Sequence, residues 1–286
     1  MANWYGLIRA VVLSWAVIAT PCISAPDQQS LSQAKQKMRA GFQSVVDDAA
    51  RAIESGQVQG KRLAAAYRNR GVNYSHLLAY DKAIEDFSKA IEIDGFNPQY
   101  YQDRAIAYLR AREFAEADRD LEMVLGLDRT NFSALREKGR TAFYRGNYEE
   151  AAGFFLQASR SADPEGKIYS MLWVSIAAQR GGKPSPLNIT VPKGQERSQW
   201  PVPVAELLTG ALSPQQLLAL AEPDNPRAYL MLQCEARFYL GQYYLMKGEK
   251  ELARQSFTAA VDTGVTDFME YDWALRELEV LSVAPR

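Results

Sequence analysis

The chain contains very little histidine and cysteine. His76 is the only histidine, and Cys22 and Cys234 are the only cysteines among 286 residues. A four-ligand zinc site and a disulfide framework need more of these side chains than the chain has. A Ser–His–Asp or Cys–His arrangement would have to use His76, and a lone histidine is more often a surface residue than a catalyst. We therefore expect no metal, no cofactor and no enzymatic activity.

The chain also has no large excess of charge of either sign. The 33 basic and 34 acidic residues give a net charge of −1, and no basic block occurs. A phosphate-driven affinity for nucleic acid is therefore not expected. Gly181-Gly182 lacks the strand–turn–helix context of a phosphate-binding loop. Adjacent carboxylates such as Glu149-Glu150 are typical of a solvated helix face. The hydrophobic fraction of 47% indicates a globular protein rather than a disordered one.

Long apolar runs are absent, and the run Ala10–Ala19 has only ten residues. A membrane-spanning helix needs about 20. Arg9 precedes this run, and the small residues Ser24 and Ala25 follow it. The order of positive charge, apolar run and small residues predicts a signal peptide over residues 1–25 that is cleaved after Ala25. We therefore expect an exported, periplasmic protein.

Cys22 offers an alternative, because bacterial lipoproteins are lipidated on a cysteine near this position. The box here reads Ala19-Thr20-Pro21-Cys22, and Pro21 and Ala19 depart from the usual pattern. This departure favours a soluble exported protein, with an outer-membrane lipoprotein as the alternative. Membrane association is expected only if Cys22 is lipidated. Cleavage after Ala25 would leave Cys234 alone, between apolar neighbours that predict a buried thiol.

A spacing of 34 residues recurs three times in a row, over residues 64–97, 98–131 and 132–165. Position 8 of each unit is small (Gly71, Ala105, Gly139), and positions 11 and 24 are mostly large and apolar. This is the tetratricopeptide pattern, a helix–turn–helix whose units bury a core by stacking on their neighbours. The predicted fold is an all-α tetratricopeptide-repeat superhelix. Such arrays present a curved surface, so we expect an adaptor that holds other proteins.

The same pattern returns without gaps at Cys234–Asp267, with Gly241 at position 8 and Phe257 at position 24. Between the two regions the pattern degrades. Eight glycines and prolines between Gly181 and Pro203 predict a loop there. The expected organisation is a signal peptide (1–25), an N-terminal helix (26–56), three repeats (57–165), an irregular middle with a degenerate repeat (166–233), a further repeat (234–267) and a capping helix with tail (268–286).

Two terminal helices complete the prediction. Ser30–Ser55 is apolar on one face, with Ser30 as its expected cap, and it would cover the array or pair with the same helix of a second chain. We therefore expect a homodimer. Asp267–Leu281 carries an apolar stripe and would cover the end of the array. An enzyme site in the 181–203 loop, next to Trp200, is a weaker alternative, because the loop offers no convincing acid, base and nucleophile.

The concave wall of the array is the predicted partner-binding site. Its first helices present a mixture of arginine, amide and apolar side chains, and arginine and tyrosine are common interface hot spots. The candidates are Arg68, Asn69, Val72, His76, Gln102, Asp103, Ile106, Leu109, Arg136, Arg140, Phe143 and Tyr144. The Lys and Asn pattern that grips chaperone C-termini is not matched, because Arg68 and Val72 occupy the first two of those positions.

Three segments of the chain, Phe238–Leu278, Ser170–Trp173 and Gln199–Gly210, resemble NlpI-type bacterial tetratricopeptide proteins beyond the generic repeat residues. The most telling are the start Phe-Tyr-Leu-Gly-x-Tyr-Tyr-Leu and the ending Phe-Met-Glu-Tyr…Ala-Leu-x-Glu-Leu. The resemblance implies a dimeric periplasmic adaptor that docks a C-terminal processing protease, presents peptidoglycan hydrolases to it and scaffolds cell-wall enzymes. A cytosolic scaffold that keeps its N-terminal helix is an alternative.

Overall fold

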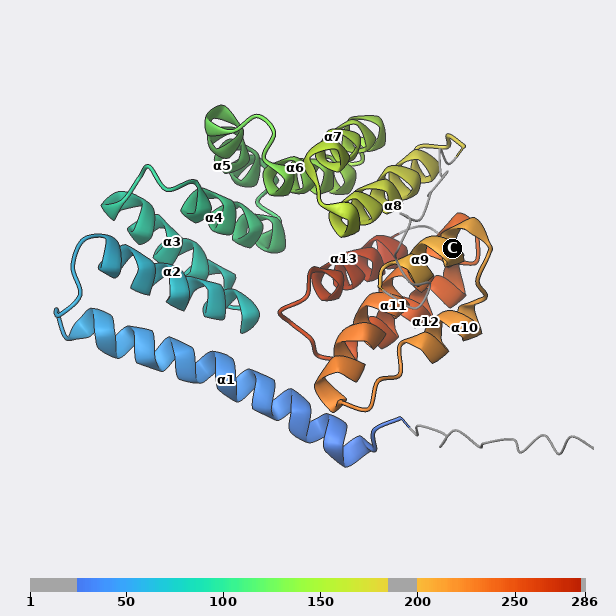
Figure 1. Ribbon diagram of the computed structural model, residues 1–286, viewed down its shortest axis with the longest axis horizontal. Coiled ribbons are helices and arrows are strands. Elements are labelled where there is room, and N and C mark those ends of the chain that lie inside the picture. Colours follow the sequence, from blue (N-terminus) through green and yellow to red (C-terminus); the bar gives the residue numbers. More distant parts are fainter. Residues whose placement is uncertain (1–24, 185–199, 284–286) are drawn as a thin grey trace, which may run out of the picture.

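The computed structural model describes residues 25–184 and 200–283, and these residues form thirteen α-helices and no strand. The helices follow one another as packed neighbours in a curved array (Figure 1). The predicted signal peptide and the lipidation candidate Cys22 lie outside the described residues. No helix in the described ranges is long and apolar enough to cross a membrane.

The first eight helices run without interruption along the array. They are α1 (Gln28–Glu54), α2 (Lys61–His76), α3 (Tyr80–Ile93), α4 (Pro98–Ala111), α5 (Phe114–Leu127), α6 (Phe132–Tyr144), α7 (Tyr148–Ser161) and α8 (Pro164–Arg180). The remaining five are α9 (Val202–Thr209), α10 (Pro214–Leu220), α11 (Pro226–Met246), α12 (Lys250–Val261) and α13 (Met269–Val283). The prediction of an all-α helical solenoid is confirmed.

Small residues at position 8 let the two helices of a unit approach each other closely. A Cβ atom added to Gly71 would lie 2.9 Å from Cε1 of Phe87, and one added to Gly139 would lie 2.8 Å from the ring of Phe155. A Cβ atom added to Gly241 would lie even closer to the ring of Phe257. Because carbon atoms do not approach to such distances, a larger residue would force the helices apart. The glycine–phenylalanine contact is therefore the repeated packing unit.

The turn inside each unit also repeats. Position 15 adopts the left-handed backbone conformation in all four units, with φ of 64° at Leu78, 68° at Arg112, 85° at Gly146 and 77° at Gly248. Glycine adopts this conformation without a steric penalty, whereas other residues lose about 1–2 kcal/mol. The turn geometry is thus kept in the first two units even where the sequence does not supply glycine.

Two helices begin earlier than the sequence predicts. Helix α1 begins at Gln28, because the side chain of Asp27 accepts a hydrogen bond of 2.7 Å from the backbone N–H of Ser30. The prediction that Ser30 is the cap is therefore wrong. Helix α11 begins at Pro226, so Cys234, the first residue of the repeat predicted over 234–267, lies in the middle of the helix. The prediction that Cys234 is buried is confirmed.

The irregular middle is described only in part, because residues 185–199 of the predicted loop lie outside the described ranges. Helix α9 packs against α8 and α11, and α10 packs against α9 and α11. Together they enclose one large core around Trp173, which is fully buried. The Trp173 ring lies 5.4 Å from the rings of both Phe143 and Phe155 and 5.0 Å from that of Trp273.

The array closes on itself through its two terminal helices. Helix α1 packs along α2 and also contacts α11, so it connects the beginning of the array with its late part (Figure 1). The Nζ atom of Lys35 donates to the backbone oxygen of Asp262 at 2.5 Å across this contact. Helix α13 packs on α11 and α12, as a capping helix does, and it also faces the inner side of the repeats.

Candidate functional site

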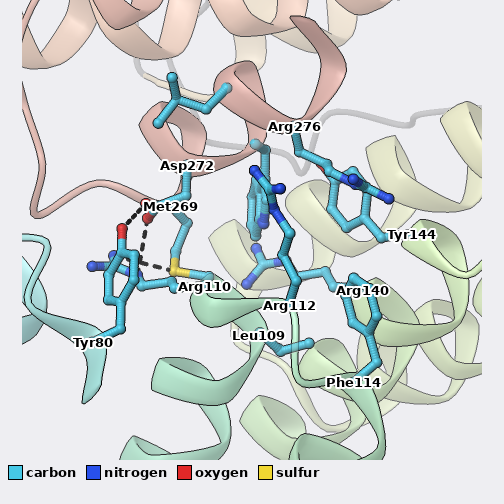
Figure 2. A pocket seen from close by; sticks show the side chains of 12 residues that line it. Tyr80, Leu109, Arg110, Arg112, Phe114, Arg140, Tyr144, Met269, Asp272 and Arg276 are labelled. Carbon is cyan, nitrogen blue, oxygen red and sulfur yellow. Dashed lines mark hydrogen bonds and ion pairs between the residues drawn. The ribbon is translucent and has the colours of Figure 1, made fainter. Parts of the chain in front are cut away.

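The concave wall is formed by α2, α4 and α6, and helix α13 covers part of it. Figure 2 shows α13 above the ends of α4 and α6, with side chains from both sides between them. Arg110 of α4 forms an ion pair of 2.9 Å with Asp272 of α13. The hydroxyl of Tyr80 donates to the same carboxylate at 2.7 Å. Both partners of the ion pair are nearly buried, so removing either one would leave an uncompensated charge between α13 and the repeats.

The covered part of the wall includes four candidates. Arg140 is 5% exposed and its guanidinium lies 3.8 Å from the ring centroid of Trp273. Phe143 is buried against Trp173. Tyr144 and Leu109 line the pocket beneath α13. The prediction that Arg140 and Phe143 face an open groove is therefore wrong, because the chain's own aromatic residues occupy the space in front of them.

His76 lies at the edge of this covered part. Its ring lies 4.8 Å from that of Phe42 on α1, and its backbone oxygen accepts a hydrogen bond of 2.5 Å from Thr266. Burial and the neighbouring Arg110 lower the pKa of His76 to about 4. The imidazole is therefore neutral near pH 7. It serves as a packed contact between three parts of the chain and not as a cation for a partner.

The remaining part of the wall, on α2 and α4, is not covered by α13. Asn69 is exposed, and Val72 and Ile106 are half-buried. Arg68 donates to Asp103 at 2.5 Å, and Gln102 donates to Ser133 at 2.7 Å. These two bonds run from one repeat to the next, so they keep the spacing of the wall as well as its polarity.

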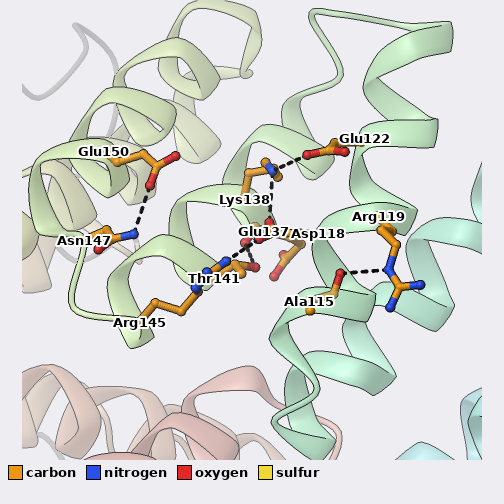
Figure 3. Close-up of polar contacts among 10 residues, drawn as sticks. All are labelled: Ala115, Asp118, Arg119, Glu122, Glu137, Lys138, Thr141, Arg145, Asn147 and Glu150. Atoms are coloured by element: carbon orange, nitrogen blue, oxygen red, sulfur yellow. Dashed lines mark hydrogen bonds and ion pairs between the residues drawn. The ribbon is translucent and has the colours of Figure 1, made fainter.

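The second and third repeats are also joined away from this wall. Asp118 of α5 accepts from Lys138 at 3.0 Å and from Arg145 at 2.8 Å, and Glu122 adds a contact of 3.3 Å with Lys138 (Figure 3). Arg136, the last candidate, is half-buried and lies 3.3 Å from the buried carboxylate of Glu137. The charged groups of the repeats thus mostly hold neighbouring helices together.

Cys234 is a buried residue of the large core. Burial raises the pKa of the Cys234 thiol far above its usual value, so the thiolate form is disfavoured. Among residues 25–184 and 200–283, no three potential ligands from histidine, cysteine and acidic residues lie together as a metal site would require.

Sequence reasoning missed the groups that α13 brings to the concave wall. Asp272, Trp273 and Arg276 lie more than a hundred residues away from Arg110 and Arg140 in the chain. The apolar stripe of α13 indicates that one face is buried, but no periodicity tells which helix covers it. Only the fold brings these residues together.

The comparisons with known proteins agree with the repeat architecture. Tetratricopeptide-repeat models match residues 64–97 and 103–166. A tetratricopeptide repeat protein from Parabacteroides merdae is 15% identical, with a TM-score of 0.49, over 89% of this chain and 99% of its own.

Two further solved structures are similar at lower scores. MamA AMB-1 is 14% identical, with a TM-score of 0.36, over 70% of this chain and 90% of its own. The P58(IPK) TPR domain is 14% identical, with a TM-score of 0.26, over 91% of this chain and 72% of its own. The assignment rests on the repeat models and the helix register, not on these scores. Residues 64–97 and 103–166 are tetratricopeptide repeats, set in an all-α solenoid of the kind that serves as a scaffold for protein–protein interactions.

Proposed function

We propose that this chain is a non-catalytic adaptor that binds a segment of another protein on the uncovered part of its concave wall. The observation that supports the proposal is the difference between the two parts of that wall. Asn69, Val72 and Ile106 present polar and apolar groups at least partly to solvent, while Arg140 and Phe143 are buried beneath α13. A partner can therefore contact α2 and α4 without displacing any part of the chain.

The proposed place of action is the bacterial periplasm. The supporting feature is the N-terminal order of positive charge, apolar run and small residues, with cleavage after Ala25. An outer-membrane lipoprotein anchored through Cys22 is the alternative form. Analysis of the N-terminus of the protein from cells would distinguish these forms. The soluble exported form begins at Pro26, the lipoprotein begins at a lipidated Cys22, and an uncleaved cytosolic scaffold begins at Met1.

The proposed clients are peptidoglycan hydrolases, which the adaptor would present to a periplasmic C-terminal processing protease. The support is the resemblance of Phe238–Leu278 to NlpI-type proteins. Many residues of that segment are core residues of this fold, among them Phe238, Phe257 and Trp273. The resemblance thus extends to the part of the chain that shapes the late half of the array. A homodimer through α1 belongs to the same proposal.

The test compares partner capture by two matched double variants. Asn69→Glu with Ile106→Glu changes the uncovered wall, and Met123→Glu with Leu127→Glu makes the same charge changes at exposed positions of α5. Each protein, cleaved after Ala25, is incubated with a cell-envelope extract, and the captured protease and hydrolases are quantified by mass spectrometry. We expect the wall variant to capture at least tenfold less protease and hydrolase than wild type, because docking would bury the two introduced charges.

The control variant should retain wild-type capture, and circular dichroism should show the same helix content for all three proteins. Equal capture by the wall variant and wild type would refute the position of the site. Failure to capture either class, from an extract shown to contain both, would refute the proposed clients.

A further inference from the structure

A pocket of about 120 Å³ lies between the repeats and α13 (Figure 2). Arg110 and Arg112 reach it from the end of α4, Arg140 from α6 and Arg276 from α13. Only one acidic residue, Asp272, belongs to the lining. Four guanidinium groups around so small a space would repel one another, so the charges of their partners decide what the pocket can bind.

The acidic partners of these arginines are already engaged. Asp272 is held by Arg110 and Tyr80. Arg140 donates to Glu137 at 2.6 Å, and Glu137 does not line the pocket. A single carboxylate, Glu279, contacts both Arg112 and Arg276. The lining itself therefore carries four cations and one acid, while the carboxylates of Glu137, Glu279 and the half-buried Glu270, a neighbour of Arg140, lie outside it.

Five buried polar atoms of the lining residues make no hydrogen bond. Nε of Arg110 and Oδ2 of Asp272 lie opposite each other in their ion pair, which leaves three donors without a partner, namely Nε of Arg140, Nε of Arg276 and the hydroxyl of Tyr144. Burial lowers the pKa of Arg140 to about 10 and raises that of Tyr144 well above its usual value. Arg140 and Tyr144 therefore carry their protons near pH 7. An arginine Nε–H can donate and cannot accept, so the group that satisfies this set is an acceptor, and the positive surroundings favour an anion.

The rest of the lining is apolar. Leu109, Phe114, Leu275 and Met269 form apolar walls, and the ring of Trp273 adds a further apolar surface. Small-molecule sites commonly combine such walls with a few polar groups that orient the ligand. We propose that this pocket binds a small organic acid, a carboxylate carried on a compact apolar body. The inference goes beyond the adaptor function and does not depend on it.

Ligand binding would also join α13 to the repeats, because the lining comes from both. Benzoate is a suitable probe, and benzamide is its uncharged counterpart of nearly the same shape. Each is titrated into the full chain by calorimetry at constant ionic strength, and the melting temperature is recorded with and without probe. We expect saturable binding of benzoate, a higher melting temperature with it, and at least tenfold weaker binding of benzamide.

Two single substitutions locate the site. Tyr144→Phe removes only the unpartnered hydroxyl, and Arg276→Gln removes a half-exposed cation. We expect each to weaken benzoate binding by about tenfold, the usual effect of losing a hydrogen bond to a charged group. Tyr244→Phe and Arg119→Gln are the matched controls, since both lie outside the pocket and Arg119, like Arg276, pairs with an acid three residues away.

The outcomes separate clearly. Equal binding of benzoate and benzamide would overturn the proposed anion preference. Unchanged affinity in both Tyr144→Phe and Arg276→Gln, or an equal loss in the two controls, would overturn the location. Inorganic phosphate that binds as tightly as benzoate would overturn the requirement for an apolar body. Wild-type melting temperatures of the unliganded variants would show that their folds are intact.

Discussion

The first two repeats and the late half of the array are stabilised in different ways. In α2–α5, buried apolar residues form small separate clusters, such as Ala83, Phe87 and Ala107. Ion pairs lie beside them, with Arg70 on Asp86 and Arg104 on Asp120 at 2.7 Å. In the late half, one continuous core surrounds Trp173 and extends from α6 to α13. The first two repeats thus rely on small separate hydrophobic clusters, whereas the helices of the late half share one large core.

This difference explains why residues 166–233 are hard to recognise in the sequence, although α6, α7, α11 and α12 keep the repeat register. A contact that recurs in every unit leaves a period of 34 residues in the sequence. The additional core contacts that α8, α9, α10 and α13 provide leave no period, because each of these helices contributes different residues. The difference also predicts how the two halves respond to substitution.

The largest effect is expected from Trp173→Ala. Removing a fully buried aromatic ring that touches Phe143, Phe155 and Trp273 should lower the free energy of unfolding by about 4 kcal/mol. Urea denaturation measures the loss. Hydrogen exchange should show lost protection in α6, α8, α11 and α13 and little change in α2 and α3. Equal loss of protection in α2 and α3 would contradict the distinction between the two halves.

A smaller effect is expected in the early half from Asp120→Ala. Asp120 accepts two hydrogen bonds, of 2.7 and 2.8 Å, from Arg104, and both side chains are largely buried. The change leaves Arg104 without its carboxylate and should cost about 2 kcal/mol of unfolding free energy. The third repeat carries Lys138 and Phe154 at the same two positions, so it has no equivalent pair.

The matched control for this prediction is Glu116→Ala, which removes the partner of Arg119 in an exposed pair. That change should cost less than about 0.5 kcal/mol, because solvent screens such pairs. Denaturation in urea compares the two variants. Similar losses in both would show that the buried pair contributes no more than a surface one.

A further effect, which needs no substitution, is a dependence of stability on pH that belongs to the late half. Burial, with the nearby Glu270 as a second cause, raises the pKa of Glu235 to about 8 from an ordinary value of 4.5. Between these two values the folded protein holds a proton that the unfolded chain releases. Stability should therefore fall as pH rises from about 5 to 8, by at most about 1.4 kcal/mol per pH unit.

Glu235→Gln tests this dependence, because glutamine keeps an acceptor for the hydroxyl of Tyr169, which donates to Glu235 at 2.5 Å. The variant should show a flatter stability profile between pH 5 and 8. Glu251→Gln, at an exposed position of α12, is the control and should follow wild type. A profile of Glu235→Gln that is as steep as that of wild type would assign the pH dependence to another group.

Much of the fold was predictable from local pattern. The helix pairs α2 with α3 and α4 with α5 follow the 34-residue register, and the breaks fall at turns such as Gly95 and Arg112. The start of α11 was placed too late, because Pro226 begins the helix outside the repeat register. For the site, the sequence predicted which residues belong to the concave wall but not which of them α13 covers. That Arg140 and Phe143 are covered could not be read from their own helix.

The sequence by itself determined the repeat register, the close glycine–phenylalanine contacts and the identity of the concave wall, because each follows from residues within about 34 positions of one another. Tertiary structure alone decided that α13 turns onto that wall and that Asp272 meets Arg110. These contacts join distant segments, and their energy depends on burial and on the partners that the completed fold supplies. Local propensity carries no information on either quantity.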